Sequence, residues 1–148
     1  MLTVRGCLFP TDRYYDAQCN VWLRPDADGH VLLGATSFGV ALAGEFIEFV
    51  PKPPGTRVEV GRAVGLLEIA KSLTSVRTPV AAVVVAANTA AVNDPMLINR
   101  HPYDDGWLVR LRVDDWAAAT RVLLRGGAVE PAFEAVMVLE NFGVEGRT

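Results

Sequence analysis

Lysine is scarce in this chain of 148 residues, which contains only Lys52 and Lys71 against twelve arginines. The net charge is −3 and the arginines are scattered, which argues against nucleic acid as the main partner. Only a lysine amine, once deprotonated, offers a nucleophilic lone pair for acylation. Because Lys71 lies between two predicted strands, we interpret it as a site of covalent attachment at a hairpin tip. The alternative is an ordinary solvated turn lysine.

Cysteine and histidine are equally rare. Cys7 and Cys19 lie twelve positions apart without a C-x-x-C pattern, and His30 and His101 stand alone. A zinc site would need a cluster of such ligands. We therefore expect Cys7 and Cys19 to be small buried or half-buried thiols.

Long apolar runs and catalytic motifs are also lacking. The longest apolar run, 80–87, is far shorter than the roughly 20 residues that span a bilayer, and residues 1–7 do not resemble a signal peptide. We expect a cytoplasmic protein with no membrane partner. No G-x-S-x-G, H-E-x-x-H or P-loop pattern occurs. This favours a carrier or binding module, and a small β-barrel enzyme using Cys7 or Cys19 is the least supported alternative.

The patterns of apolar and turn residues along the chain predict a mainly β domain. Alternating segments at 20–24 and 30–34 flank a turn at 26–29 and predict a hairpin. Residues 1–20 are interpreted as a lead-in with a turn at 9–12. Many short strands at close spacing favour a sandwich or barrel; the others are expected at 45–50, 57–60, 63–69, 76–80, 83–87 and 107–113.

Helices are expected at the periphery and towards the C-terminus. Thr36-Ser37 can cap a helix that ends at Gly44, and residues 93–99 form a helical turn. Asp114-Asp115 can cap another helix that reaches Leu123, and Pro131 suits the first turn of the last one. The apolar stripe of this last helix is expected to pack in the core. We predict a single domain, 1–148, with a helical extension from about 114; the stripe comprises Phe133, Val136 and Met137.

Several motifs occur in an order that resembles the H protein of the glycine cleavage system, a lipoyl carrier. The resemblance covers most of residues 6–113. The Glu-x-x-Lys spacing and the block that ends in Gly-Trp-Leu are its most specific parts. The motifs are Phe9-Pro10 through Trp22-Leu23-Arg24, Leu67-Glu68-x-x-Lys71, Thr78-Pro79-Val80, Ala87-Asn88, and Pro95-x-Leu97-Ile98-Asn99-x-x-Pro102-Tyr103-x-x-Gly106-Trp107-Leu108.

The resemblance implies a barrel-sandwich hybrid, as in lipoyl domains, and a non-catalytic role. It implies lipoate on Lys71, attached by a lipoate ligase or lipoyl transferase that recognises Glu68, and contacts of the arm with Asn20, where the family usually has histidine. The arm would carry an intermediate and reducing equivalents between glycine decarboxylase, aminomethyltransferase and dihydrolipoamide dehydrogenase.

Departures from the family pattern leave two alternatives open. Ala82 replaces a usual glycine eleven positions after Lys71, which implies either a different local turn or less efficient lipoylation. An unlipoylated H-like binding module is therefore one alternative. The segments 5–10, 20–24 and 99–103 are also similar to lipoate-binding proteins of sulfur oxidation, which work with a heterodisulfide-reductase-like complex. That carrier role is the other alternative.

Overall fold

The computed structural model describes residues 1–143, which form three antiparallel sheets. The six-stranded sheet has the order β3 (Tyr14–Asp16), β4 (Val21–Pro25), β5 (Val31–Ala35), β11 (Val109–Val113), β10 (Ala82–Ala87) and β7 (Arg57–Val58). The three-stranded sheet has the order β6 (Glu48–Pro51), β8 (Ala63–Ile69) and β9 (Ser72–Arg77). A hairpin of β1 (Leu2–Val4) and β2 (Cys7–Phe9) forms the third.

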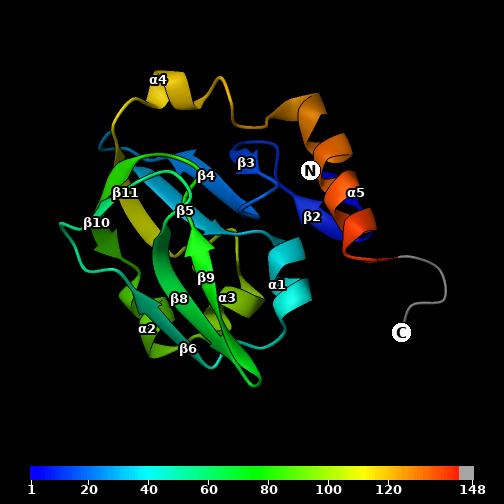
Figure 1. Ribbon diagram of the computed structural model, residues 1–148, viewed down its shortest axis with the longest axis horizontal. Helices are drawn as coiled ribbons and strands as arrows, with labels where there is room; N and C mark the ends of the chain where they lie inside the picture. The colour runs from blue at the N-terminus through cyan, green and yellow to red at the C-terminus, as the bar shows by residue number, and fades with distance from the viewer. Residues whose placement is uncertain (144–148) are drawn as a thin grey trace.

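Short helices surround these sheets (Figure 1). They are α1 (Ser37–Ala43), α2 (Thr89–Asn93), α3 (Met96–Arg100), α4 (Trp116–Ala119), the 3-10 turn η1 (Gly126–Ala128) and α5 (Val129–Leu139). Within residues 1–143, no helix combines the length and the apolar character needed to cross a bilayer. The expectation of a mainly β fold with short peripheral and C-terminal helices is confirmed.

The main core lies between the six-stranded and three-stranded sheets. A register shift between Ala63 and Gly65 interrupts the alternation of β8, so Val64 and Leu67 both lie in one buried cluster with Leu33 and Leu111 of the larger sheet's middle strands. This cluster closes the two sheets into the barrel-sandwich hybrid that the sequence predicts. The side chains of Val64, Leu67 and Val76 thereby attach the β8–β9 hairpin to the main core.

A second core forms between the β1–β2 hairpin and α5, which lie side by side in Figure 1. Phe133 and Met137 are fully buried, and the Phe133 ring lies 4.6 Å from that of Phe9. The predicted packing role of the C-terminal stripe is therefore confirmed for these two residues. Arg5 also pairs with Glu134 across this contact, at 2.6 Å. The single-domain assignment stays a prediction, and its last residues, 144–148, lie outside the described part.

Three expectations about elements were wrong. Residues 1–20 contain β1, β2 and β3 instead of a lead-in; each strand has three residues, which is too short for alternation to reveal. The strand expected at 76–80 is β9, which ends at Arg77 because Pro79 has no N–H to donate to a ladder. The helix capped by Asp115 ends at Ala119, well before Leu123.

Candidate functional site

Lys71 lies at the tip of the β8–β9 hairpin. The two strands of this hairpin meet at the lower edge of Figure 1. Ile69 pairs with Ser72, so a two-residue turn of Ala70 and Lys71 connects the strands. Lys71 is exposed, and no ion pair or hydrogen bond to its amine occurs within residues 1–143. The hairpin tip predicted from the sequence is therefore confirmed, and it presents a lysine amine to solvent.

Glu68 lies three residues before the tip, on the face of β8 opposite to Leu67. It pairs with Glu48 of β6 on one side and with Leu73 of β9 on the other. The structure places Glu68 next to the hairpin tip but not in an ion pair with Lys71, as far as the described residues show. The two neighbouring carboxylates make this outer face acidic.

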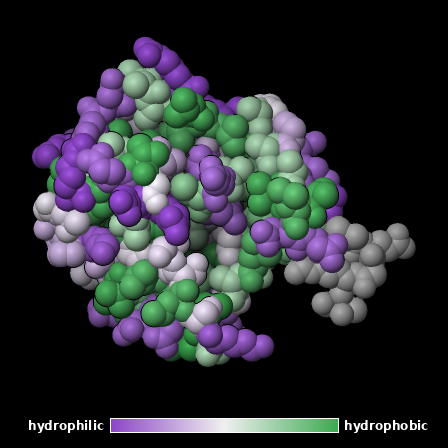
Figure 2. Space-filling model, in the orientation of Figure 1, coloured by the Kyte–Doolittle hydropathy of each residue, from purple (hydrophilic) through white to green (hydrophobic). Residues whose placement is uncertain are grey.

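A groove of about 370 Å³ runs between β9 and α1 and reaches the hairpin tip, because Ile69 and Ser72 both line it. In Figure 1, α1 lies beside the hairpin, and Figure 2 shows the same face with hydrophilic and hydrophobic side chains interspersed over it. The groove is lined by Cys19, Asn20, Val21, Ala35, Gly39, Leu42, Ala43, Phe46, Leu67, Ile69, Ser72, Leu73, Thr74, Ser75 and Val76.

Asn20 holds the α1 side of the groove in place. Its backbone has a φ of 60°, a left-handed conformation that asparagine tolerates better than most residues. The Thr36 hydroxyl donates a hydrogen bond to Asn20 Oδ1 and accepts one from the Gly39 N–H as the helix N-cap, at 3.0 Å. A Cβ on Gly39 would lie 3.2 Å from Asn20 Nδ2, so glycine allows the close approach. The predicted contact between Asn20 and an attached arm stays a prediction.

Cys19 is a groove residue that the sequence did not identify. It is half-buried and reduced, and its N–H donates to Asp16 Oδ2 at 2.7 Å. Burial, together with the Asp16 carboxylate, raises the pKa of the Cys19 thiol to about 12, so it is protonated at neutral pH. Cys7 is buried in the second core. The expectation of buried and half-buried thiols is confirmed; the position of Cys19 depends on long-range packing that no local pattern encodes.

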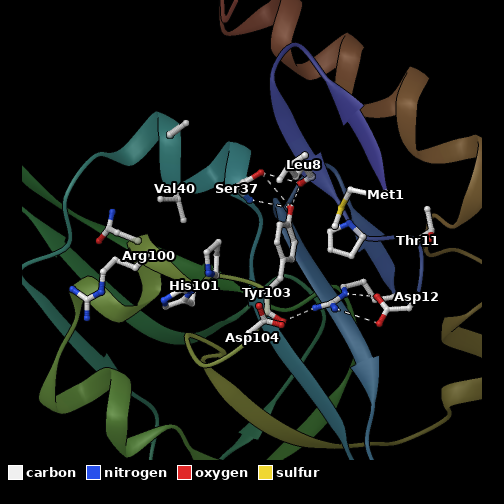
Figure 3. Close-up of a pocket in the computed structure, with 15 residues that line it drawn as sticks. Met1, Leu8, Thr11, Asp12, Ser37, Val40, Arg100, His101, Tyr103 and Asp104 are labelled. Carbon is white, nitrogen blue, oxygen red and sulfur yellow. Dashed lines mark hydrogen bonds and ion pairs between the residues drawn. The ribbon is translucent and has the colours of Figure 1, made fainter.

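A larger cavity of about 700 Å³ lies on the opposite face of α1 (Figure 3). Ser37, Val40 and Ala41 line it, whereas Gly39, Leu42 and Ala43 line the groove; these triplets occupy opposite sides of a helix.

The central polar groups of this cavity already have partners. The Tyr103 hydroxyl donates to the Leu8 carbonyl at 2.6 Å and accepts from the Ser37 N–H at 3.0 Å. The Arg13 guanidinium donates to the Tyr103 carbonyl and to Asp12. These hydrogen bonds connect elements of the fold to one another, and Lys71 does not line this cavity.

Ala82 is the first residue of strand β10. It is fully buried in β10, paired with Val113 and Val58, and it is not among the described residues with positive φ. The backbone at this position therefore does not require glycine. The effect of Ala82 on lipoylation stays a prediction.

Comparison with known proteins agrees with this geometry. A family model described as glycine cleavage H-protein matches residues 13–135. Glycine cleavage system H protein 3 of Aquifex aeolicus is 41% identical over 108 residues, covering 73% of this chain and 67% of that protein. Probable glycine cleavage system H protein 3 of Sulfurisphaera tokodaii is 32% identical over 140 residues, covering 95% of both chains.

A solved structure is also similar. The crystal structure of a glycine cleavage system H protein from Mycobacterium marinum superposes with a TM-score of 0.65 at 33% identity, covering 72% of this chain and 87% of that one. The fold, the exposed lysine on its hairpin and these relatives agree. The chain belongs to the glycine cleavage H-protein family, non-catalytic carriers with lipoate covalently attached to a lysine.

Proposed function

We propose that Lys71 is the residue of this chain that carries lipoate. The observation that carries the proposal is the exposed Lys71 amine at a two-residue turn, next to a groove that begins at the same turn. The other lysine, Lys52, follows β6 in the Pro-rich loop and does not line the groove. When attached, the dithiolane of lipoate supplies a disulfide that opens when it accepts electrons or cargo.

The hairpin suits a modifying enzyme because its conformation is fixed. Residues of β8 pair with β9 along the whole length of the hairpin, and Leu67 and Val76 are buried in the main core below it. A ligase therefore meets one turn geometry and does not lose the free energy needed to order a loop. Glu68, on the outer face, is proposed to contribute to recognition by that ligase.

The same geometry supports a shuttling role. We assign to the groove the task of holding the arm between visits to partner enzymes, with Asn20 and Thr74 on its two walls. Glu48 and Glu68 make the neighbouring face acidic and suit basic docking surfaces. Glycine decarboxylase, aminomethyltransferase and dihydrolipoamide dehydrogenase are the partners that we propose. The cytoplasmic location expected from the sequence stays a prediction.

Intact-mass measurement after incubation with a lipoate ligase, ATP and lipoate tests the attachment site. We expect one lipoyl addition on the wild-type protein and on Lys52→Arg, and none on Lys71→Arg. Lys52→Arg is the matched control because it removes the other lysine by the same substitution. A lipoylated Lys71→Arg variant, or an unmodified wild type under conditions that load a known H protein, contradicts the proposal. The second outcome favours the unlipoylated binding module.

A carrier role in sulfur oxidation is the second candidate function. It is favoured by the Cys19 thiol in the groove wall, whose lining within residues 1–143 includes no carboxylate for a cargo amine. Offering the loaded protein separately to glycine decarboxylase with glycine and to a heterodisulfide-reductase-like complex separates the candidates. Exchange of labelled bicarbonate into glycine supports glycine cleavage; reduction or loading by the second complex alone supports sulfur oxidation.

A further inference from the structure

Arginines that are scattered along the sequence come together on the outer face of the six-stranded sheet. Leu111 of β11 is buried in the main core, so its neighbours Arg110 and Arg112 project from the opposite side of the sheet. Residues that pair across strands share a face, and Leu32 of β5 pairs with both Arg24 and Arg110. Arg24, Arg110 and Arg112 therefore form one surface, called the arginine face.

The spacing of these side chains suits one short ligand segment. Arg24 and Arg110 lie on either side of β5, which places their Cα atoms about 10 Å apart. Arg112 is two residues further along β11, a rise of about 7 Å. An extended peptide rises about 3.3 Å per residue, so a segment of about four residues can contact all three side chains.

Most of the charge on and around the arginine face is already paired. The ion pairs are Arg13 with Asp12, Arg110 with Asp26, and Arg57 with Asp114 and Glu59. Arg24 and Arg112 take part in no ion pair among residues 1–143. The pKa of Asp114 is lowered chiefly by its hydrogen bonds with Arg57, and Arg112 contributes only through its charge. Two cationic side chains therefore remain available on this face.

Arg24 has an unsatisfied donor as well as an unpaired charge. The residue is half-buried, and its Nε is buried without a hydrogen-bond partner in the described structure. A buried N–H without an acceptor has lost its hydration without compensation. Side chains at interfaces commonly change rotamer on binding, and such a rotation lets one carboxylate accept from both Nε and Nη of Arg24. Arg112 is exposed and offers its planar guanidinium directly to solvent.

We propose that the arginine face docks a carboxylate-rich segment of a partner protein, which pairs its carboxylates with Arg24 and Arg112. A peptide carries its negative charges at chosen positions and can match two unpaired arginines. A nucleic-acid backbone carries a charge at every nucleotide and would meet the aspartates that stand among the arginines, such as Asp26. The inference goes beyond the proposed carrier role and does not depend on lipoate at Lys71.

The arginine face points away from the acidic face beside Lys71. The two larger sheets enclose the main core between them, so their outer faces point in opposite directions. Glu48 and Glu68 lie on the outer face of the three-stranded sheet. A protein bound at the arginine face therefore leaves the hairpin tip accessible. One partner can hold the carrier while another acts at Lys71.

Titration of the unlipoylated protein with a capped peptide of alternating glutamate and threonine tests the proposal. ¹⁵N-resolved NMR follows the arginine Nε–H groups and the backbone amides of the whole chain. The same peptide with glutamine in place of glutamate is the control for charge, and oligothymidylate and inorganic phosphate are the control anions. We expect the glutamate peptide to shift the Nε–H signals of Arg24 and Arg112. The amide of Ser72, beside the hairpin tip, should stay unchanged.

Paired substitutions measure the contribution of the two unpaired arginines. Arg24→Gln combined with Arg112→Gln should weaken binding of the glutamate peptide about tenfold. Arg62→Gln combined with Arg121→Gln is the matched control, because it removes the same charge from two exposed arginines outside the strands of this sheet. It should change the affinity less than about twofold. Arg112→Gln alone changes an exposed side chain, should weaken binding about threefold, and decides the question if the double variant does not fold.

Four results overturn the proposal. The glutamate peptide shifts no arginine signal, the glutamine peptide binds equally well, or the two double variants lose affinity equally. In the fourth, oligothymidylate or phosphate shifts the same signals at the same concentration as the glutamate peptide, because the face then recognises phosphate. Failure of lipoylation at Lys71 is a separate outcome that leaves this proposal unaffected.

Discussion

Gly34 in β5 is a position at which one added methyl group should disturb the fold strongly. It lies directly opposite Trp22 in the β4–β5 register, and the indole covers it. A Cβ at Gly34 would lie 2.4 Å from both Cε2 and Cζ2 of Trp22, closer than real Cβ contacts occur. Trp22 is fully buried and cannot tilt into solvent. We therefore expect Gly34→Ala to displace the indole.

The cost follows from what holds the indole. Overpacking costs about 1–3 kcal/mol, and displacement weakens the 2.9 Å hydrogen bond from Trp22 Nε1 to the Pro102 carbonyl, worth about 0.5–1.5 kcal/mol. Alanine recovers about 0.4–1 kcal/mol by restricting the unfolded chain. We expect Gly34→Ala to lower the free energy of unfolding by about 2–3 kcal/mol.

Urea denaturation followed by circular dichroism measures this change. An unchanged dependence of the free energy of unfolding on urea concentration indicates that the unfolded state is unaffected. Gly127→Ala is the control, because nothing lies within 4 Å of its added Cβ, and should stay within about 0.5 kcal/mol of wild type. In a Trp22→Leu background the clash partner is gone, so Gly34→Ala should become nearly neutral. An equal cost in both backgrounds refutes the reasoning.

Other predictions concern the helices. Thr36→Ala removes the α1 N-cap and the partner of Asn20 Oδ1, and should cost about 1–2 kcal/mol by urea denaturation while changing the NMR resonances of Gly39; Thr36→Ser should retain most of the stability. Phe133→Ala should cost about 3–5 kcal/mol because its fully buried ring packs on Phe9, with hydrogen exchange faster in both β1 and α5. Hydrogen bonding to Arg5 holds the pKa of the Glu134 carboxyl below its usual value. The ionised Glu134 therefore stabilises the folded protein above the ordinary glutamate pKa, and this stabilisation is lost as the pH falls through the pKa of Glu134 in the folded state. The Tm difference between wild type and Glu134→Gln should therefore be larger at pH 7 than at pH 3, and a difference that grows on acidification contradicts the assignment.

Local sequence signals predicted the parts of the fold that local physics determines. The 26–29 turn and its flanking strands appear as the β4–β5 hairpin, and Thr36 and Gly44 cap α1 as expected. The position of Lys71 at a hairpin tip also followed from the apolar runs around it. Each of these features depends on residues fewer than about ten positions apart, which is the range of turn and capping chemistry.

The groove could not be predicted in this way. Its walls combine the turn at Cys19 and Asn20 with β9, more than fifty residues later in the chain. β9 is mostly polar and exposed at the edge of its sheet, so the sequence predicted a strand only from Val76 and missed residues 72–75. Only the paired strands show that Ser72 begins a strand instead of continuing a turn.

The second core has a consequence for the order in which the chain can fold. It joins Val4 and Phe9, among the first residues made, to Met137, one of the last in the described structure. The main core includes nothing beyond Leu123, so it can form before α5 docks. Until α5 docks, Phe9 and Tyr15 lack the cover that Phe133 provides, so a chain truncated before Val129 exposes an apolar surface to chaperones.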